Sequence, residues 1–185
     1  MSINQNVLGL IFASINDSAV IDLTKLRTMG SIPYGGRYRM VDFPLSNMVN
    51  SGISEVGVIT KSNYGSLLDH LGSGREWDLT RKRGGLNIVP PFAERSVKVY
   101  SGRVDALESI LSWLEAQKER YVILSDAYTA LNFDFADLID AHVNSNADVT
   151  MVYNRAVIPE GARSDNYTVR VDDDGRVTEI LTNDY

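Results

Sequence analysis

The sequence predicts an α/β protein built on a mainly parallel central sheet. Three short, largely apolar runs carry this prediction, at residues 7–13, 53–60 and 121–124. Runs of this length are typical of strands buried on both faces, as in a parallel sheet. Helical patterns separate the runs, and alternating strands and helices indicate parallel pairing. We therefore expect these three strands to be neighbours in one sheet.

The first half of the chain contains a helix with recognisable ends. Asp42 or Phe43 lies near its start, Pro44 suits a first helical turn, and Ser51-Gly52 suits its end. The predicted helix therefore starts close to Asp42 or Phe43 and runs to Asn50. The other elements predicted in this half are a short helix at 64–71 and strands at 86–89 and 97–100.

The second half is predicted to contain two more helices and a hairpin. Apolar residues recur at helical spacing within residues 105–118, which predicts one amphipathic helix there. Residues 167–171 and 177–181 alternate between apolar and polar around Asp172-Asp173-Asp174-Gly175, which indicates a β-hairpin with an ordinary turn. The calcium-loop spacing is absent from this turn. The remaining predicted elements are a helix at 135–143 and a strand at 147–153.

Length and composition indicate one ordinary globular domain over residues 1–185. Acidic residues outnumber basic ones by 24 to 18, so the sequence argues against a nucleic-acid-binding protein. The chain has no cysteine, which excludes disulfides, zinc–thiolate sites and thiol nucleophiles. The apolar run near the N-terminus lacks a basic flank and is too short to span a bilayer. We therefore expect a cytoplasmic protein that binds neither nucleic acid nor membranes.

Few residues suggest a catalytic or binding site. The sequence contains no P-loop and no Gly-rich dinucleotide motif after the first strand. His70 and His142 lie on predicted helices without clustered ligands, so structural or solvated roles are expected. The basic cluster Arg81-Lys82-Arg83, with Arg75 nearby, is either a solvated loop or an anion site for a small phosphorylated ligand.

One edge of the predicted sheet is the expected place for a ligand. Ligands of parallel α/β sheets bind beyond the carboxyl ends of the strands. This edge brings together the segment from Ser14 onward, Lys61-Ser62 and Ser125-Asp126. Asp126 is a candidate magnesium ligand, because a hard cation prefers carboxylate oxygen, and it is equally a candidate helix or turn cap.

Several segments in a fixed order resemble one enzyme family. The longest is Ile32-Pro33-Tyr34-Gly35-Gly36-Arg37-Tyr38-Arg39-Met40-Val41-Asp42-Phe43-Pro44-Leu45-Ser46-Asn47. The others are residues 50–53, 71–74, 77–79, 84–85 and 88–91, and a helix start with Gly102 and Asp105-Ala106-Leu107. Together they resemble glucose-1-phosphate adenylyltransferase, also called ADP-glucose pyrophosphorylase, over essentially the whole chain. The segment that begins at Gly102 looks like that family's G-T-A-D-A-[VI] helix start.

The resemblance implies a fold, a reaction and a set of contacts. The fold is a Rossmann-like nucleotidyltransferase domain, a three-layer α/β/α sandwich. The family joins ATP to glucose-1-phosphate with Mg²⁺, and the ADP-glucose formed feeds glycogen or starch synthesis. Catalysis of this kind depends on cations placed over developing negative charge. The positions that match the family's nucleotide and loop contacts are Gly72, Ser73, Gly74, Gly84, Gly85, Gly102 and Asp105.

The chain departs from the family where phosphate chemistry occurs. The family follows its first strand with a loop of the form G-G-x-G-x-R-L, whereas residues 13–20 here contain no Gly and no Arg, and Asp17 adds a negative charge. The family's next lysine corresponds to Met29. Its metal-binding Asp corresponds to Tyr128, six residues before Asp134, while Asp126 lies eight residues before it. No residue of this chain is therefore assigned as catalytic.

These departures make the chain similar to the GlgD-type companion subunit of some bacterial enzymes of this family. Residues 29–39 and 58–71 look most like that subfamily. The resemblance implies a regulatory subunit that pairs with a catalytic one, and an N-terminal part without the family's C-terminal β-helix. Two alternatives stay open: an active nucleotidyltransferase with an unusual loop, and an interaction domain without a nucleotide site. Mg²⁺ is expected only if some catalysis remains.

Overall fold

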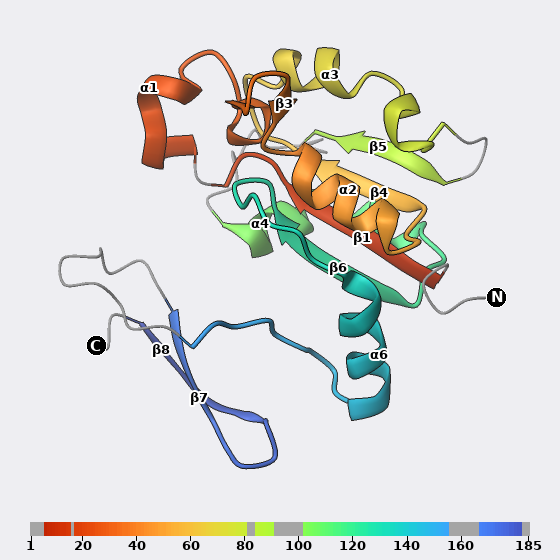
Figure 1. Ribbon diagram of the computed structural model, residues 1–185, viewed down its shortest axis with the longest axis vertical. Helices are drawn as coiled ribbons and strands as arrows, with labels where there is room; N and C mark the ends of the chain where they lie inside the picture. The colour runs from red at the N-terminus through yellow and green to blue at the C-terminus, as the bar shows by residue number, and fades with distance from the viewer. Residues whose placement is uncertain (1–5, 16, 81–83, 91–101, 156–166, 183–185) are drawn as a thin grey trace. The chain divides into compact units, whose positions relative to one another are not determined.

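The computed structural model describes residues 6–15, 17–80, 84–90, 102–155 and 167–182 (Figure 1). The chain forms two compact units, Met1–Ala147 and Asp148–Tyr185, which are described separately below. The predicted strand at residues 97–100 and the basic cluster at residues 81–83 lie outside the described residues.

The first unit contains a four-stranded sheet in the order β5-β4-β1-β6 (Figure 1). All three strand pairs are parallel, as predicted. In the central strand, Leu10 lies opposite Gly57 of one neighbour and Leu124 of the other. The strands are β1 (Val7–Phe12), β4 (Glu55–Ile59), β5 (Gly85–Val89) and β6 (Tyr121–Asp126).

Helices cover both faces of this sheet, which confirms the three-layer α/β/α architecture. Along β1, Val7 and Ile11 belong to one apolar core, whereas Leu8, Leu10 and Phe12 belong to a second core on the opposite face. The first core is shared with α2 (Asp42–Asn50), α3 (Gly65–Leu71) and α6 (Phe135–Ser145). The second is shared with α4 (Arg103–Glu108) and with residues of and next to α5 (Leu111–Glu115). Because every residue of β1 is buried, its sequence is apolar throughout.

Short elements connect the strands and helices. The turn sequence Pro-Tyr-Gly-Gly forms a small hairpin of β2 (Pro33–Tyr34) and β3 (Tyr38–Arg39). The polar stretch after β1 folds into a series of single turns rather than one extended loop. These turns are η2 (Asp17–Val20), α1 (Ile21–Thr24) and η3 (Met29–Ser31), and a fourth, η4 (Arg75–Trp77), follows α3.

The amphipathic segment at residues 105–118 is two helices, so the prediction of one continuous helix was wrong. The break lies at Ser109-Ile110, between α4 and α5. The Ser109 hydroxyl donates to the carbonyl of Ala106 at 2.7 Å, and the Ile110 N–H donates to the carbonyl of Leu107, three residues back. A serine hydroxyl competes with the backbone for helical carbonyls, and apolar periodicity does not reveal this competition.

Two strand predictions also need correction. Residues 148–155 form no strand, and Val149 is 81% exposed, so the strand predicted at residues 147–153 was wrong. Residues that favour strands form one only where the surrounding structure pairs with them, so composition alone does not predict a strand. β6 was expected to be buried, but it is an edge of the described sheet, and Val122 and Leu124 are each about half exposed.

The second unit contains the predicted hairpin of β7 (Tyr167–Val171) and β8 (Val177–Thr182). The Asp172 carboxylate accepts the backbone N–H groups of Asp174 at 3.1 Å and Arg176 at 2.8 Å. Gly175 adopts a φ of 81°, which suits glycine. The acidic sequence therefore forms a turn closed by its own aspartate, as predicted.

Candidate functional site

The carboxyl ends of β1, β4 and β6 meet at one edge of the sheet, as the sequence predicted. Ser14, just after β1, is buried, and its hydroxyl lies 3.2 Å from that of Thr60, just after β4. The Ser14 hydroxyl also accepts the backbone N–H of Lys61 at 3.2 Å. Asp126 ends β6, in register with Phe12 at the end of β1. We call this edge, with the segments that follow its strands, the carboxyl rim.

The segment after β1 folds back onto the carboxyl rim through a hydrogen bond to Asp17. The Asp17 carboxylate accepts the backbone N–H of Met29 at 2.7 Å. The Thr24 hydroxyl donates to the Asp17 carbonyl at 2.6 Å, which closes the turns between them. The next residue, Gly30, donates its N–H to the carbonyl of Ala13 at 2.9 Å. The Met29 N–H, which lies beside the strand ends, is therefore already used in a hydrogen bond to a carboxylate of the chain itself.

Burial raises the pKa of Asp17 above its ordinary value of 3.8. The hydrogen bond from Met29 and the positive charge of Lys61 act in the opposite direction but are smaller. Beside them, the buried Thr28 hydroxyl has no hydrogen-bond partner within the described part of the chain. This half of the rim thus carries an acid where a triphosphate-binding loop would present N–H donors and cations.

On the other half of the rim, Arg103 forms a two-pronged ion pair with Asp126. Its Nε donates to Oδ1 at 3.0 Å and one terminal nitrogen donates to Oδ2 at 2.6 Å. The same nitrogen also donates to the Tyr128 hydroxyl at 3.2 Å. The hydrogen bond to Asp126 raises the pKa of Arg103 further, so the guanidinium stays charged. Gly102 caps the helix that Arg103 begins, and Asp105 lies in its first turn.

Arg103 was not among the predicted site residues. A signal was available, because the family pattern G-T-A-D-A has a threonine at the position that Arg103 occupies in the matched segment. An arginine in the first turn of a helix can reach the end of a neighbouring strand, and its planar fork matches a carboxylate. The pairing itself depends on the fold, which brings α4 and β6 together.

The predicted contacts at Gly72, Ser73, Gly74, Gly84 and Gly85 lie elsewhere. Gly85 is the first residue of β5 and pairs with Glu55, the first residue of β4, so it marks the amino ends of the parallel strands. Ser73 and Gly84 line one polar cavity of about 540 Å³ there. The other residues lining it are Glu55, Leu79, Thr80, Leu86, Asn87, Trp113 and Gln117. The structure therefore separates these glycines from Gly102, Asp105 and Asp126, at the opposite edge of the sheet.

Two of these glycines are needed by the fold itself. Gly74 has a φ of 75°, and a Cβ there would lie 2.9 Å from the Cβ of Leu86. Gly84 has a φ of 79°, and a Cβ there would lie 2.7 Å from a carboxylate oxygen of Glu55. Because of the positive φ and the close contact, any residue other than glycine would be strained at either position. Tight turns and close packing account for these positions, and ligand contact there stays a prediction.

Glu55 is the buried charge of this amino-end cavity. The Asn87 side-chain amide donates to its carboxylate at 2.7 Å. Burial raises the pKa of Glu55, and the negative charge of Glu119 raises it further. No group of three or more His, Cys, Asp or Glu residues suited to a metal ion occurs among the described residues. The cavity thus combines one carboxylate with neutral amides, hydroxyls and a tryptophan.

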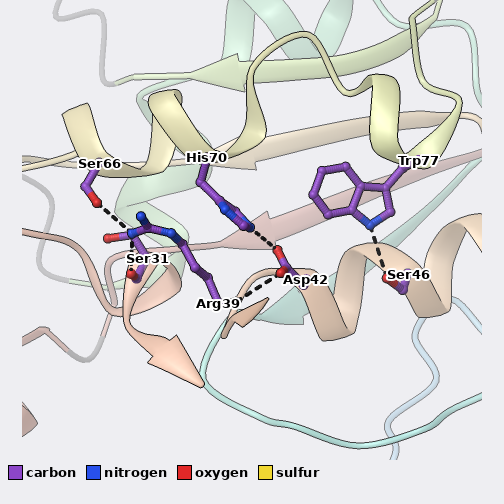
Figure 2. A network of polar contacts seen from close by, with 7 residues as sticks. All are labelled: Ser31, Arg39, Asp42, Ser46, Ser66, His70 and Trp77. Carbon is purple, nitrogen blue, oxygen red and sulfur yellow. Dashed lines mark hydrogen bonds and ion pairs between the residues drawn. The ribbon is translucent and has the colours of Figure 1, made fainter. Parts of the chain in front are cut away.

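A polar network joins the segment at residues 32–47 to α3 (Figure 2). One terminal nitrogen of Arg39 donates to the Ser31 carbonyl at 2.7 Å and to the Ser66 hydroxyl at 2.6 Å. The Arg39 backbone N–H donates to one Asp42 oxygen at 3.0 Å, and the other oxygen lies 2.6 Å from Nε2 of His70. Asp42 and His70 are largely buried. The longest matched motif therefore fastens α2 to α3.

Both histidines have structural surroundings, as predicted. His70 packs edge-on against Trp77, with ring centroids 6.2 Å apart, and the Trp77 indole N–H donates to Ser46 at 3.1 Å (Figure 2). His142, near the end of α6, packs edge-on against Tyr121 at 5.6 Å. Neither histidine lies beside Asp126, so the described rim contains no candidate His-based acid or base.

With this geometry in place, comparison with known proteins identifies the family. The nucleotidyl transferase family matches residues 10–181. The chain therefore belongs to the nucleotidyl transferase family, and its sheet is the Rossmann-like core of that fold. Within the described residues, no helix is both long and apolar enough to cross a membrane.

The individual relatives fall into two groups by name. Glycogen biosynthesis protein GlgD of Geobacillus stearothermophilus is 38% identical over 153 residues, which are 82% of this chain and 45% of that protein. GlgD of Bacillus subtilis is 37% identical over 151 residues, 81% of this chain and 44% of that protein. Glucose-1-phosphate adenylyltransferase of Bacillus mycoides is 35% identical over 152 residues, 82% and 40% respectively. The chain thus spans less than half the length of these relatives.

Proposed function

We propose that this chain is part of a regulatory-type subunit that pairs with a catalytic glucose-1-phosphate adenylyltransferase and supports ADP-glucose formation for glycogen synthesis. One observation carries the proposal: the Asp17 carboxylate accepts the Met29 N–H at 2.7 Å. A nucleotide-binding loop needs its donors free for phosphate oxygens. Here an internal anion uses the donor, and residues 13–20, which correspond to the family's loop, contain no Gly and no Arg.

The size of the effect argues against turnover by this chain. Removing one preorganised donor from a site that stabilises developing charge lowers the rate roughly 10²- to 10³-fold. The chain lacks both the arginine of the loop and the lysine at Met29. The two losses act on the same transition state, so their effects on the rate need not multiply. Among the described residues, Lys61 is the cation whose charge acts on Asp17.

The similarity to GlgD proteins supports the glycogen part of the proposal, because these two relatives are named glycogen biosynthesis proteins. The candidate ligands are ATP, glucose-1-phosphate and ADP-glucose, at vestigial contacts. Residues 102–105 are the best placed of the predicted contacts, since they lie on the carboxyl rim beside Asp126. A cytoplasmic location belongs to the proposal, because the reaction consumes ATP.

The test is ADP-glucose formation from ATP, glucose-1-phosphate and Mg²⁺, measured with the chain alone and with a catalytic relative from the same organism. The relative must retain the Gly-rich loop, its Arg and its Lys. We expect no product from the chain alone, and a changed rate or effector response in the mixture. Replacing by Met the lysine of the relative that corresponds to Met29 should silence the mixture and show that all turnover belongs to the partner.

Substantial turnover by the chain alone would overturn the proposal in favour of an active enzyme with an unusual loop. An unchanged partner, together with no binding of ATP or ADP-glucose by calorimetry, would favour an interaction domain without a nucleotide site. The active-enzyme alternative relies on Asp126, Arg75 and residues 81–83 as substitute chemistry. Arg75 follows Gly74, beside the beginning of β5, and residues 81–83 lie outside the described residues.

A further inference from the structure

Asp126 is the candidate magnesium ligand that the sequence predicts, because it is a carboxylate at the end of a parallel strand. It ends β6 on the carboxyl rim, and its side chain is 20% exposed. Mg²⁺ binds through oxygen ligands in a near-octahedral shell and keeps several waters. A carboxylate serves such an ion only when its oxygens face open solvent or other oxygen ligands.

The surroundings of Asp126 do not fit a magnesium ion. Both carboxylate oxygens accept hydrogen bonds from Arg103, at 3.0 and 2.6 Å. The guanidinium is a cation with donors only, so it repels a second cation and offers it no ligand. The nearby Tyr128 hydroxyl accepts from the same arginine at 3.2 Å. The described residues also supply no second and third acidic or histidine ligand.

The Arg103 side chain is held in this position by the fold. It is the first residue of α4, and the core residue Ala106, three positions later, fixes that helix on the sheet. The two parallel hydrogen bonds match the fork of a guanidinium to the two oxygens of a carboxylate, which is the strongest geometry such a pair adopts. The Arg103 side chain is partly exposed, so metal ions added to the solution can reach the pair.

We infer that Arg103 is the built-in counter-cation of Asp126 and takes the place of a divalent metal on the carboxyl rim. The chain thus neutralises this carboxylate with its own side chain and binds no Mg²⁺ there. The inference deepens the proposed function and rests on it only for the expectation that a metal belongs at this edge. It assigns Arg103 a role that the resemblance does not, since the family pattern has threonine at this position.

Paramagnetic broadening by Mn²⁺ tests the inference on the 185-residue chain labelled with ¹⁵N. In the wild type, we expect no selective broadening of the amide signals of residues 124–128. In Arg103→Gln, these signals should broaden at a Mn²⁺ concentration roughly 10- to 100-fold lower than the wild type would need. This is the factor expected for losing a charge-assisted pair. The effect should disappear in Arg103→Gln/Asp126→Asn, and Arg103→Lys should resemble the wild type, because the cation is kept.

A matched control is Arg170→Gln, which removes an arginine paired with Glu179 at 2.9 Å in the hairpin. It should leave residues 124–128 unaffected by Mn²⁺. Selective broadening in the wild type that Asp126→Asn removes would overturn the inference, and this comparison needs no Arg103 variant to fold. A well-dispersed Arg103→Gln spectrum without the gain would overturn it too. No arm measures ADP-glucose, so failure here is distinct from failure of the proposed function.

Discussion

Replacing Asp17 by Ala should destabilise the first unit by removing the acceptor for the Met29 N–H. The hydrogen bond is short, at 2.7 Å, and Met29 is 91% buried, since only 9% of its surface is exposed. A buried N–H without a partner costs about 1–3 kcal/mol. Asp17 itself is only about half buried, so water can partly replace it. We therefore expect a loss of about 1–2 kcal/mol in the free energy of unfolding.

Asp17→Asn is the matched variant, because an asparagine side-chain oxygen can accept the same N–H without carrying charge. Burial raises the pKa of Asp17, so the folded state holds the carboxylate less readily than the unfolded chain does. Ionised Asp17 therefore lowers stability at neutral pH, and this penalty fades as pH falls through the raised folded pKa towards the ordinary value. Asp17→Asn should match or exceed the wild type at pH 7, and this difference should shrink in acid.

Urea unfolding followed by tryptophan fluorescence measures both effects. The chain has two tryptophans, and Trp77 and Trp113 both lie in the first unit, so the signal reports that unit. A loss of about 1–2 kcal/mol corresponds to a lower urea midpoint by about 0.5–1 M. Equal losses in Asp17→Ala and Asp17→Asn would refute the hydrogen-bond explanation. A stability gain of Asp17→Asn that grows in acid would refute the assigned pKa direction.

Three further predictions use the same measurement. Thr28→Val should raise stability by about 1 kcal/mol, because it removes a buried hydroxyl without a described partner, whereas Thr24→Val should lower it, because that hydroxyl donates to a carbonyl at 2.6 Å. Gly84→Ala should cost about 2 kcal/mol or more through its positive φ and the 2.7 Å contact, whereas Gly102→Ala, with no atom within 4 Å, should be nearly neutral. Glu55→Gln should be at least as stable as the wild type at pH 7, because burial raises the Glu55 pKa, and its advantage should fade as pH falls through that pKa; a constant difference from pH 3 to 8 would contradict this.

Much of the fold could be predicted from local sequence because its core strands are apolar throughout. Residues 7–13 were recognised as a buried strand, and they form the centre of the sheet with both faces covered. The helix α2 was predicted to start near Asp42 or Phe43 and to end at Asn50, and it covers Asp42–Asn50, because its end signals are local. The hairpin of β7 and β8 was equally visible from alternation and its Asp-Gly turn.

The elements that were missed depend on partners outside the local segment. Residues 147–153 have the composition of a strand, but they form none in the described structure. The break at Ser109 depends on one hydroxyl bond that periodicity does not show. At the candidate site, Asp126 was recognised by its place after a strand, but its partner Arg103 lies 23 residues away in the chain. Residues 72–74 and 84–85 were grouped by motif with Gly102 and Asp105, although the fold places them at the amino ends of the parallel strands.

The amino and carboxyl ends of the parallel strands explain why this chain resembles the family in its fold but departs from it in its chemistry. The segments that match the family are mainly those that build the domain: Arg39 and Asp42 join α2 to α3, and Gly74 and Gly84 fit where no Cβ can. The departures gather at the carboxyl rim. There, a donor or carboxylate left without its phosphate or metal would be costly to bury. Asp17 accepts the Met29 N–H and Arg103 pairs with the Asp126 carboxylate, so both groups have a partner without a ligand, and these two pairings are what the Asp17 and Mn²⁺ experiments measure.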